Sequence, residues 1–178
     1  ALMKITHVIR GEDGLSNTPR QLLLYSALGF ETPRFAHLPL LLGRDRSKLG
    51  KRHGPVGLLE YRDAGILPQA MFNYLALLGW NPGEGETQEI FTSEELISRF
   101  TLENVNKAGA IFDIEKLAHI NTEYLRALPV DEFITLAKPH LPAFEVDEYA
   151  RRALDTARER VRTVAELNEV INADGKKE

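Results

Sequence analysis

The sequence predicts a mixed fold, in which a short α/β segment is followed by an all-helical region. Two strand-like segments, residues 5–10 and 35–42, flank a helical segment at residues 20–28, and this order makes one βαβ unit. After residue 54 the strand patterns stop, and capped helical segments follow one another along the chain. At 178 residues the chain is long enough for one sizeable domain or two small ones.

The βαβ unit is predicted from three local signals. β-Branched alternation over residues 5–10 is typical of a strand, and Thr18 followed by Pro19 is typical of an N-cap and a first helical position. The apolar run of residues 35–42 predicts a second, buried strand. Because only two good strands are available, a sheet built from this chain alone would be thin. We therefore expect the chain to be a piece of a longer protein.

The later helices are predicted from caps and from helical spacing of apolar residues. Thr92 and Glu95 form a capping box, and Met71, Phe72 and Tyr74 are predicted to lie in a helical core. The predicted helices are residues 57–64, 69–78, 94–100, 114–121, 122–128, 131–138, 147–162 and 164–172.

Composition excludes several classes of protein. There is no cysteine, so neither a disulfide framework nor a cysteine-based zinc site is possible, and the five histidines show no metal-ligand spacing. No apolar run is long enough to cross a bilayer, and no signal-peptide pattern opens the chain, so we expect a cytoplasmic protein. The net charge of −4 predicts no generic affinity for nucleic acid, so any contact with it should be local.

A basic loop is the main candidate site. Residues 44–52 hold five basic side chains in nine positions, directly after the second strand, where ligands of open α/β sheets bind. Lys48 and Lys51 are spaced so that both ammonium groups could reach one polyphosphate, and Gly50 and Gly54 permit close approach to a ligand. The alternative is a surface loop that carries cations for solubility, and composition alone leaves the two interpretations balanced.

Other polar residues have structural explanations beside functional ones. Arg10, at the end of the first strand, could hold a carboxylate in a bidentate fork, but without further context an ion pair with a neighbouring acid is the favoured explanation. His7 and His37 are predicted to be core or cleft histidines rather than ligands. The arginines of residues 151–162 alternate with acids, which favours a salt-bridged helix face.

These pieces, in this order, resemble the class I aminoacyl-tRNA synthetases, and within them the glutamyl-tRNA synthetase family of bacteria and organelles. The resemblance extends from the first residue to about Pro142. It rests on residues 5–13 with 17–19, residues 34–41 with 46–52, residues 67–70 with 73–80, and residues 112–117 with Asn121 and Tyr124.

The resemblance implies an ATP-binding loop. Residues 48–52 are similar to the KMSKS signature, in which Lys51 would be the lysine that stabilises the ATP phosphates, with Lys48 and Arg52 beside the same phosphates. Gly50 stands where the signature has serine, so a hydroxyl is missing and the backbone gains freedom.

The resemblance also implies roles at the ends of the two strands. Asp13 corresponds to an acidic residue near ATP, the backbone near Leu41 to the part that holds the adenine ring, and Arg10 to the arginine that recognises the glutamate side-chain carboxylate. Gly14 stands where relatives commonly have histidine or an aromatic residue, so a wall beside the nucleotide is expected to be missing.

At the level of domains, the resemblance implies three parts. Residues 1–54 would be the C-terminal part of a Rossmann-like catalytic domain, residues 55–142 a helical stem-contact domain, and residues 143–178 an extension toward an anticodon-binding domain outside this chain. The implied partners are glutamate, ATP with Mg²⁺, and tRNA(Glu), in a monomeric parent that serves protein biosynthesis. The second class I signature, of the type His-x-Gly-His, does not occur in these residues, so the chain alone is expected to be inactive.

Two alternatives remain at the level of sequence. One is a paralogue that glutamylates a modified base of tRNA, although the long helical region after the basic loop argues against it. The other is a non-catalytic RNA-binding module, in which the basic loop and the arginine-rich helix grip phosphates.

Overall fold

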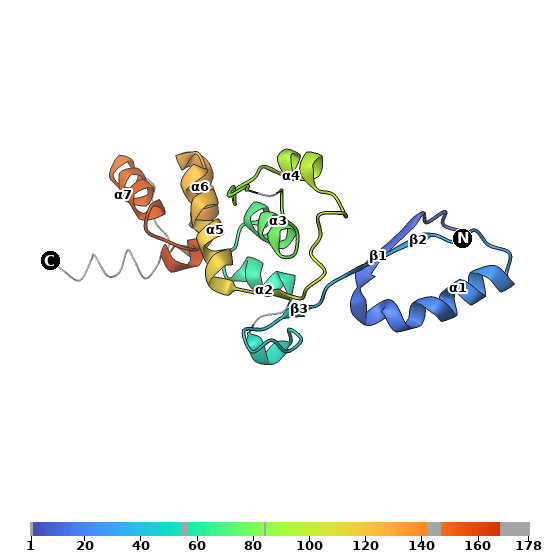
Figure 1. The fold of residues 1–178 in the computed structure, drawn as a ribbon. Coiled ribbons are helices and arrows are strands. Elements are labelled where there is room, and N and C mark those ends of the chain that lie inside the picture. The colour runs from blue at the N-terminus through green and yellow to red at the C-terminus, as the bar shows by residue number, and fades with distance from the viewer. Residues whose placement is uncertain (1, 55–56, 84, 142–146, 168–178) are drawn as a thin grey trace.

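The protein is described by a computed structural model that covers residues 2–54, 57–83, 85–141 and 147–167. A small βαβ unit lies apart from a larger helical body, and one extended segment connects the two (Figure 1). The mixed fold, with the α/β part first and the helices after it, is therefore confirmed.

The βαβ unit consists of β1 (His7–Gly11), α1 (Thr18–Ala27) and β2 (Arg34–Leu38). The two strands pair in parallel, with His7 opposite Arg34 and Gly11 opposite Leu38. Among the described residues this sheet has two strands, as the sequence predicts, and none of its strand residues is fully buried. His7 is exposed, so its predicted place in a core or cleft is wrong, whereas His37 is half-buried.

The predicted N-cap at Thr18 is wrong. A 3₁₀ helix, Glu12–Asn17, runs directly into α1, so Thr18 already has helical angles and Asn17 takes the cap position without a side-chain hydrogen bond. The Thr18 side chain is buried and accepts a hydrogen bond from Arg10 instead. A tertiary contact therefore replaces the local cap at this position.

The predicted strand at residues 35–42 is also wrong as a single, buried element. It divides at Pro39, because proline has no N–H to donate to a strand ladder. β2 ends at Leu38, and the short strand β3 (Leu41–Leu42) pairs in parallel with β4 (Ala110–Ile111) in a separate sheet. The chain thus leaves the βαβ unit and joins the helical body before the basic loop begins.

The helical body contains α2 (Leu58–Asp63), α3 (Pro68–Leu77), α4 (Ser93–Arg99), α5 (Ile114–Ala127), α6 (Val130–Ala137) and α7 (Glu148–Arg158). The capping box of Thr92 and Glu95 is confirmed at the start of α4. None of the helices in the described ranges is long and apolar enough to cross a membrane.

Four predicted helices differ from the structure. Residues 114–121 and 122–128 form one continuous helix, α5, because the polar Asn121 turns inward to hydrogen-bond other segments and does not end the helix. The helix predicted at residues 147–162 is α7, which ends earlier, at Arg158. Of residues 164–172, Val164–Glu166 forms a 3₁₀ turn, and residues 168–172 lie outside the described residues.

The core of the protein lies in the helical body. α3 packs against α5, and Tyr74, Leu117, Ile120 and Phe133 are almost fully buried among the side chains of α2, α3, α5, α6 and α7. Met71 and Tyr74 are in this core, as predicted. Phe72 does not lie in the core, so that part of the prediction is wrong. Met71 and Tyr74 are three residues apart and define the inner face of α3, and Phe72 points away from this face and is 47% exposed.

Candidate functional site

The basic loop leaves β3 and folds back onto it. Leu49 N donates to Leu41 O at 2.8 Å, and Gly43 N donates to Ser47 O at 2.8 Å. Lys48 also forms an isolated antiparallel bridge with Leu42. The base of the loop is therefore held by main-chain hydrogen bonds to the strand from which it begins.

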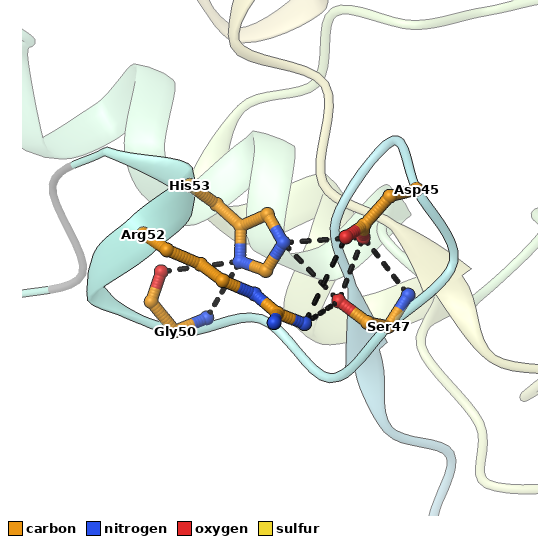
Figure 2. A network of polar contacts seen from close by, with 5 residues as sticks. All are labelled: Asp45, Ser47, Gly50, Arg52 and His53. Carbon is orange, nitrogen blue, oxygen red and sulfur yellow. Dashed lines mark hydrogen bonds and ion pairs between the residues drawn. The ribbon is translucent and has the colours of Figure 1, made fainter.

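A polar network fixes the interior of the loop (Figure 2). One carboxylate oxygen of Asp45 accepts hydrogen bonds from Ser47 N at 2.9 Å and from Ser47 Oγ at 2.7 Å. His53 Nε2 lies 3.1 Å from the same oxygen, and Gly50 N donates to His53 Nδ1 at 3.0 Å. Arg52 donates to Ser47 Oγ and lies 3.7 Å from the Asp45 carboxylate.

This network sets the protonation state of Asp45. The hydrogen bonds from the Ser47 side chain and backbone, with a smaller contribution from His53, lower the pKa of Asp45 to about 2. The carboxylate is therefore ionised at any physiological pH. A charged acceptor makes stronger hydrogen bonds than a neutral one, so it suits the centre of the network.

The sequence analysis missed Asp45, Ser47 and His53. One local signal was available: an aspartate two residues before a serine often accepts from its backbone N–H in an Asx turn. Arg46, between the two, has a positive φ of 61°. The contact of His53 with Asp45 carries no comparable signal, because it depends on how the whole loop closes.

Lys48 and Asp13, both predicted site residues, lie together in the structure. Lys48 Nζ lies 2.8 Å from Asp13 Oδ2, although both side chains are more than half exposed. The hydrogen bond and charge of Lys48 lower the pKa of Asp13. This contact brings the basic loop onto the carboxyl end of β1, across the gap between the two sheets.

Lys51 and Arg52 lie in a 3₁₀ turn, Lys51–His53, at the far side of the loop. Arg52 belongs to the network around Ser47. Lys51 is exposed, and it has no ion pair or hydrogen-bonded side-chain partner among the described residues. Its ammonium group is therefore available to an anion.

Arg10 is held by neutral groups. Its Nη2 atom donates to Gly14 O at 3.0 Å and to Thr18 Oγ1 and Gln21 Oε1 at 2.8 Å each, and its Nε donates to His37 Nε2 at 3.3 Å. Within the described residues no acid pairs with Arg10, so the ion pair proposed as its structural explanation is not found. The guanidinium group is fixed in place and its charge is not neutralised.

Gly14 makes room for this arrangement. A Cβ atom at position 14 would lie 2.7 Å from Arg10 Nε and 2.9 Å from Arg10 Cδ. Any larger residue would therefore displace the Arg10 side chain from its present position. The space that a side chain at position 14 would take is filled here by Arg10.

Leu41 lies at the junction of the two parts of the molecule. Its carbonyl accepts from Leu49 N, and it pairs with Ala110 in the second sheet. Beside it is a pocket of about 320 Å³, with Gly11 from the βαβ unit on one side and Trp80 from the helical body on the other.

The loop is also tied to the helical body. Arg44 lies 2.9 Å from Asp113, whose carboxylate caps α5 by accepting from Glu115 N at 3.0 Å. The hydrogen bond from Arg44 is the main cause of the lowered pKa of Asp113. Together with Lys48–Asp13, this contact makes the loop a bridge between the end of β1 and the start of α5.

Outside the loop, four of the five arginines in residues 151–162 form ion pairs with acids, in line with the predicted salt-bridged face. The ion pairs are Arg151–Asp131, Arg152–Glu148, Arg158–Asp155 and Arg162–Glu115. In the described part of the chain, no three His, Asp or Glu side chains gather so that they could hold a metal ion.

Comparison with known proteins assigns the class to which this fold and site belong. Residues 1–119 match the family described as tRNA synthetases class I (E and Q), catalytic domain. Since this match covers more than half of the chain, the chain belongs to that family.

Its relatives define the class further. The chain is 51% identical over 172 residues to the glutamate–tRNA ligase of Aquifex aeolicus, covering 94% of this chain and 36% of that ligase. It is 56% identical over 141 residues to the glutamate–tRNA ligase of Heliobacterium modesticaldum, covering 79% and 28%. The chain thus spans about a third of the length of the curated relatives it matches.

A solved structure agrees with this result. The crystal structure of the glutamate–tRNA synthetase from Elizabethkingia anophelis superposes with a TM-score of 0.83 at 35% sequence identity, covering 98% of this chain and 38% of that one. The likeness therefore includes both the βαβ unit and the helical body.

Proposed function

We propose that the chain is an internal part of a glutamate–tRNA ligase. The whole enzyme would activate glutamate with ATP, release pyrophosphate, and transfer the glutamyl group to the 3′ end of tRNA(Glu). The observation that carries this proposal is the contact of Lys48 with Asp13 at 2.8 Å, which brings the basic loop onto the carboxyl end of β1 in a chain of this family. Ligands of open α/β sheets bind at that edge.

The basic loop supplies the charge for adenylate formation. Negative charge develops on the phosphates as pyrophosphate leaves, and fixed cations lower the free energy of that transition state. We assign Lys51 as the principal catalytic contact because it is exposed and has no partner among the described residues. Lys48, positioned by Asp13, and Arg52, positioned by Ser47, flank the same phosphates, and the backbone near Leu41 holds the adenine ring.

Arg10 binds the side-chain carboxylate of glutamate. Its Nε and Nη2 atoms donate to neutral acceptors that fix the guanidinium plane, and no acid among the described residues competes for its charge. A preorganised, unneutralised arginine at a strand end is suited to charge-assisted recognition of a carboxylate.

The remaining partners follow from the same assignment. ATP enters as its Mg²⁺ complex, so the metal comes with the substrate, and tRNA(Glu) contacts the helical body. We divide the chain at residue 54 into the end of the catalytic domain and a stem-contact domain, which runs to residue 142, with residues 143–178 leading toward an anticodon-binding domain. The parent is proposed to be a cytoplasmic monomer.

The site in this chain is half of the catalytic apparatus. The basic loop is present, but a His-x-Gly-His sequence is not found in the 178 residues. Because both signatures act on ATP, we expect these residues alone to give no glutamate-dependent ATP–pyrophosphate exchange. Measurable exchange by the isolated chain would contradict this expectation.

No observation favours the two alternative functions. An RNA-binding module would need free cations on α7, but Arg151, Arg152 and Arg158 are paired with acids. A base-modifying paralogue is not favoured by relatives that are glutamate–tRNA ligases over 94% of the chain.

The experiment is Lys51→Ala in the full-length ligase. We expect glutamate-dependent ATP–pyrophosphate exchange to fall by about 10²–10³-fold, the usual loss on removing one preorganised charge from a transition state. Lys138→Ala, an exposed lysine on the helical body, is the matched control and should leave the rate unchanged. Unchanged exchange in Lys51→Ala, or salt-sensitive tRNA binding with no exchange in the wild-type protein, would contradict the proposed function.

A further inference from the structure

We propose that His53 is a positioning residue that locks the turn of the basic loop, so that Lys48 and Lys51 face one polyphosphate together. The inference rests on the proposed function of the loop. His53 contacts no substrate in this proposal; it acts through the backbone that carries the two lysines.

The imidazole ring contacts residues before and after Lys48 in the sequence. Before Lys48, Nε2 of the ring lies 3.1 Å from Asp45 Oδ1 and 3.2 Å from Ser47 Oγ. After Lys48, Nδ1 of the ring accepts a hydrogen bond from Gly50 N at 3.0 Å. A neutral ring with its proton on Nε2 makes both bonds at once, by donating to the carboxylate and accepting from the amide.

The Nδ1 atom has a second neighbour in the same residue, because it also lies 3.2 Å from Gly50 O. The ring therefore faces both main-chain polar groups of Gly50 and acts as a mechanical restraint on that residue.

The ring is also packed against the strand from which the loop begins. The His53 side chain is only 14% exposed, and a Cβ atom added at Gly43 would lie 2.5 Å from its Cδ2 atom. Gly43 directly follows β3, so the ring connects the far turn of the loop to the point where it starts. Glycine is required at position 43 for this close approach.

This restraint matters most because of Gly50. A glycine between the two lysines has more backbone freedom than any other residue, which would let Lys48 and Lys51 move independently. His53 limits that freedom twice: its ring accepts from Gly50 N, and its own N–H donates to Gly50 O at 2.8 Å. Since Lys51 has no partner of its own in the described residues, the position of its ammonium group depends on this turn.

The test uses His53→Phe in the full-length ligase. Phenylalanine keeps a ring against Gly43 but removes every side-chain hydrogen bond. We expect kcat of ATP–pyrophosphate exchange to fall about tenfold, since small misplacements of catalytic groups cost ten- to a hundredfold. KM for glutamate should stay within about twofold, because Arg10 lies outside the loop. The same change at the exposed His119 of α5 is the control and should have no effect.

Coupling to Lys51 separates positioning from a general structural role. If His53 acts through the lysines, His53→Phe should cost less than about twofold in a Lys51→Ala background, because coupled residues are not additive. A full tenfold loss in that background overturns the proposal. Gly43→Ala, which displaces the ring without changing its polar atoms, should reproduce the loss seen in His53→Phe.

A second readout needs no activity. In the same protein without substrates, the Gly50 amide should exchange with deuterium about tenfold faster in His53→Phe than in wild type, because its acceptor is removed. Unchanged Gly50 exchange overturns the proposal even if the ligase is active. Faster Gly50 exchange in a protein with no glutamate-dependent activity would instead contradict the proposed function and leave the restraint supported.

Discussion

The basic loop and the helical body are stabilised in opposite ways. In the loop, polar groups that are largely exposed form a network around Asp45, and one lysine reaches across to Asp13. In the helical body, Leu117, Ile120 and Phe133 are fully buried among apolar neighbours. The comparison shows that the proposed site is supported by directional contacts, whereas the free energy of folding comes from the apolar core of the helical body.

This difference suits the proposed role of the loop in binding the phosphates of ATP. Exposed ion pairs such as Lys48–Asp13 and Arg44–Asp113 contribute little net free energy, because water screens them and long side chains lose entropy. A phosphate group can therefore replace the carboxylate partner of a loop cation at a small cost in free energy. The buried core behaves differently, because removing side-chain atoms from it removes packing contacts and lowers stability.

The largest expected effect on stability tests the helical side of this comparison. Leu117→Ala removes a side chain with no exposed surface, so it should lower the free energy of unfolding by ~2–5 kcal/mol, measured by urea unfolding. Leu23→Ala, at a leucine of α1 that is 71% exposed, should change it by less than ~0.5 kcal/mol. A small effect at Leu117 would mean that the helical body does not carry the stability.

A smaller loss is expected at a buried polar contact. Asn121 connects three segments: its Oδ1 accepts from Leu67 N at 2.7 Å, and its Nδ2 donates to Arg162 O at 2.7 Å. Asn121→Ala leaves these buried backbone groups unsatisfied, so it should cost ~1–3 kcal/mol of unfolding free energy. Asn17→Ala is the matched control, because Asn17 is exposed and makes no side-chain cap. Equal effects of the two changes would contradict the special role of the buried amide.

Local signals predicted much of the fold but failed where distant residues decide. The capping box of Thr92 and Glu95 needs only four consecutive residues, and it is confirmed. Thr18 shows the same kind of signal, but Arg10, eight residues away, takes its hydroxyl. Asn121 resembles a break in a helix, yet contacts more than 40 residues away in sequence keep it inside α5. Pro39 was a local signal that was missed in the fold, since it explains why the second strand divides.

The same limit applies to the site. The spacing of Lys48 and Lys51 is compatible with a phosphate-binding loop. Spacing does not reveal that Asp13 would be the partner of Lys48. Only the resemblance to a family placed Lys48 and Asp13 near ATP. His53 carries no sequence signal, because its contacts require the loop to close on itself. The residues proposed to do the chemistry were thus easier to find than the residue proposed to position them.

The smallest expected effect sharpens the comparison at Asp13. Lys48 holds the pKa of the Asp13 carboxyl below its ordinary value of 3.8, so Lys48→Ala should raise that pKa back toward 3.8, measured by NMR titration of the side chain. Because the pKa is lowered in the folded protein, any stability from the pair is present above pH 3.8 and is lost as the pH falls through the lowered value.

At neutral pH we expect the urea midpoint of Lys48→Ala to match that of the wild type, because the pair is exposed and screened. Arg62→Ala provides the control, since Arg62 pairs with Asp63 at the surface of the helical body and not with Asp13, and it should leave the Asp13 titration unchanged. A clear loss of stability in Lys48→Ala would show that the loop contributes to the fold as the core does, and the contrast between the two regions would then fail.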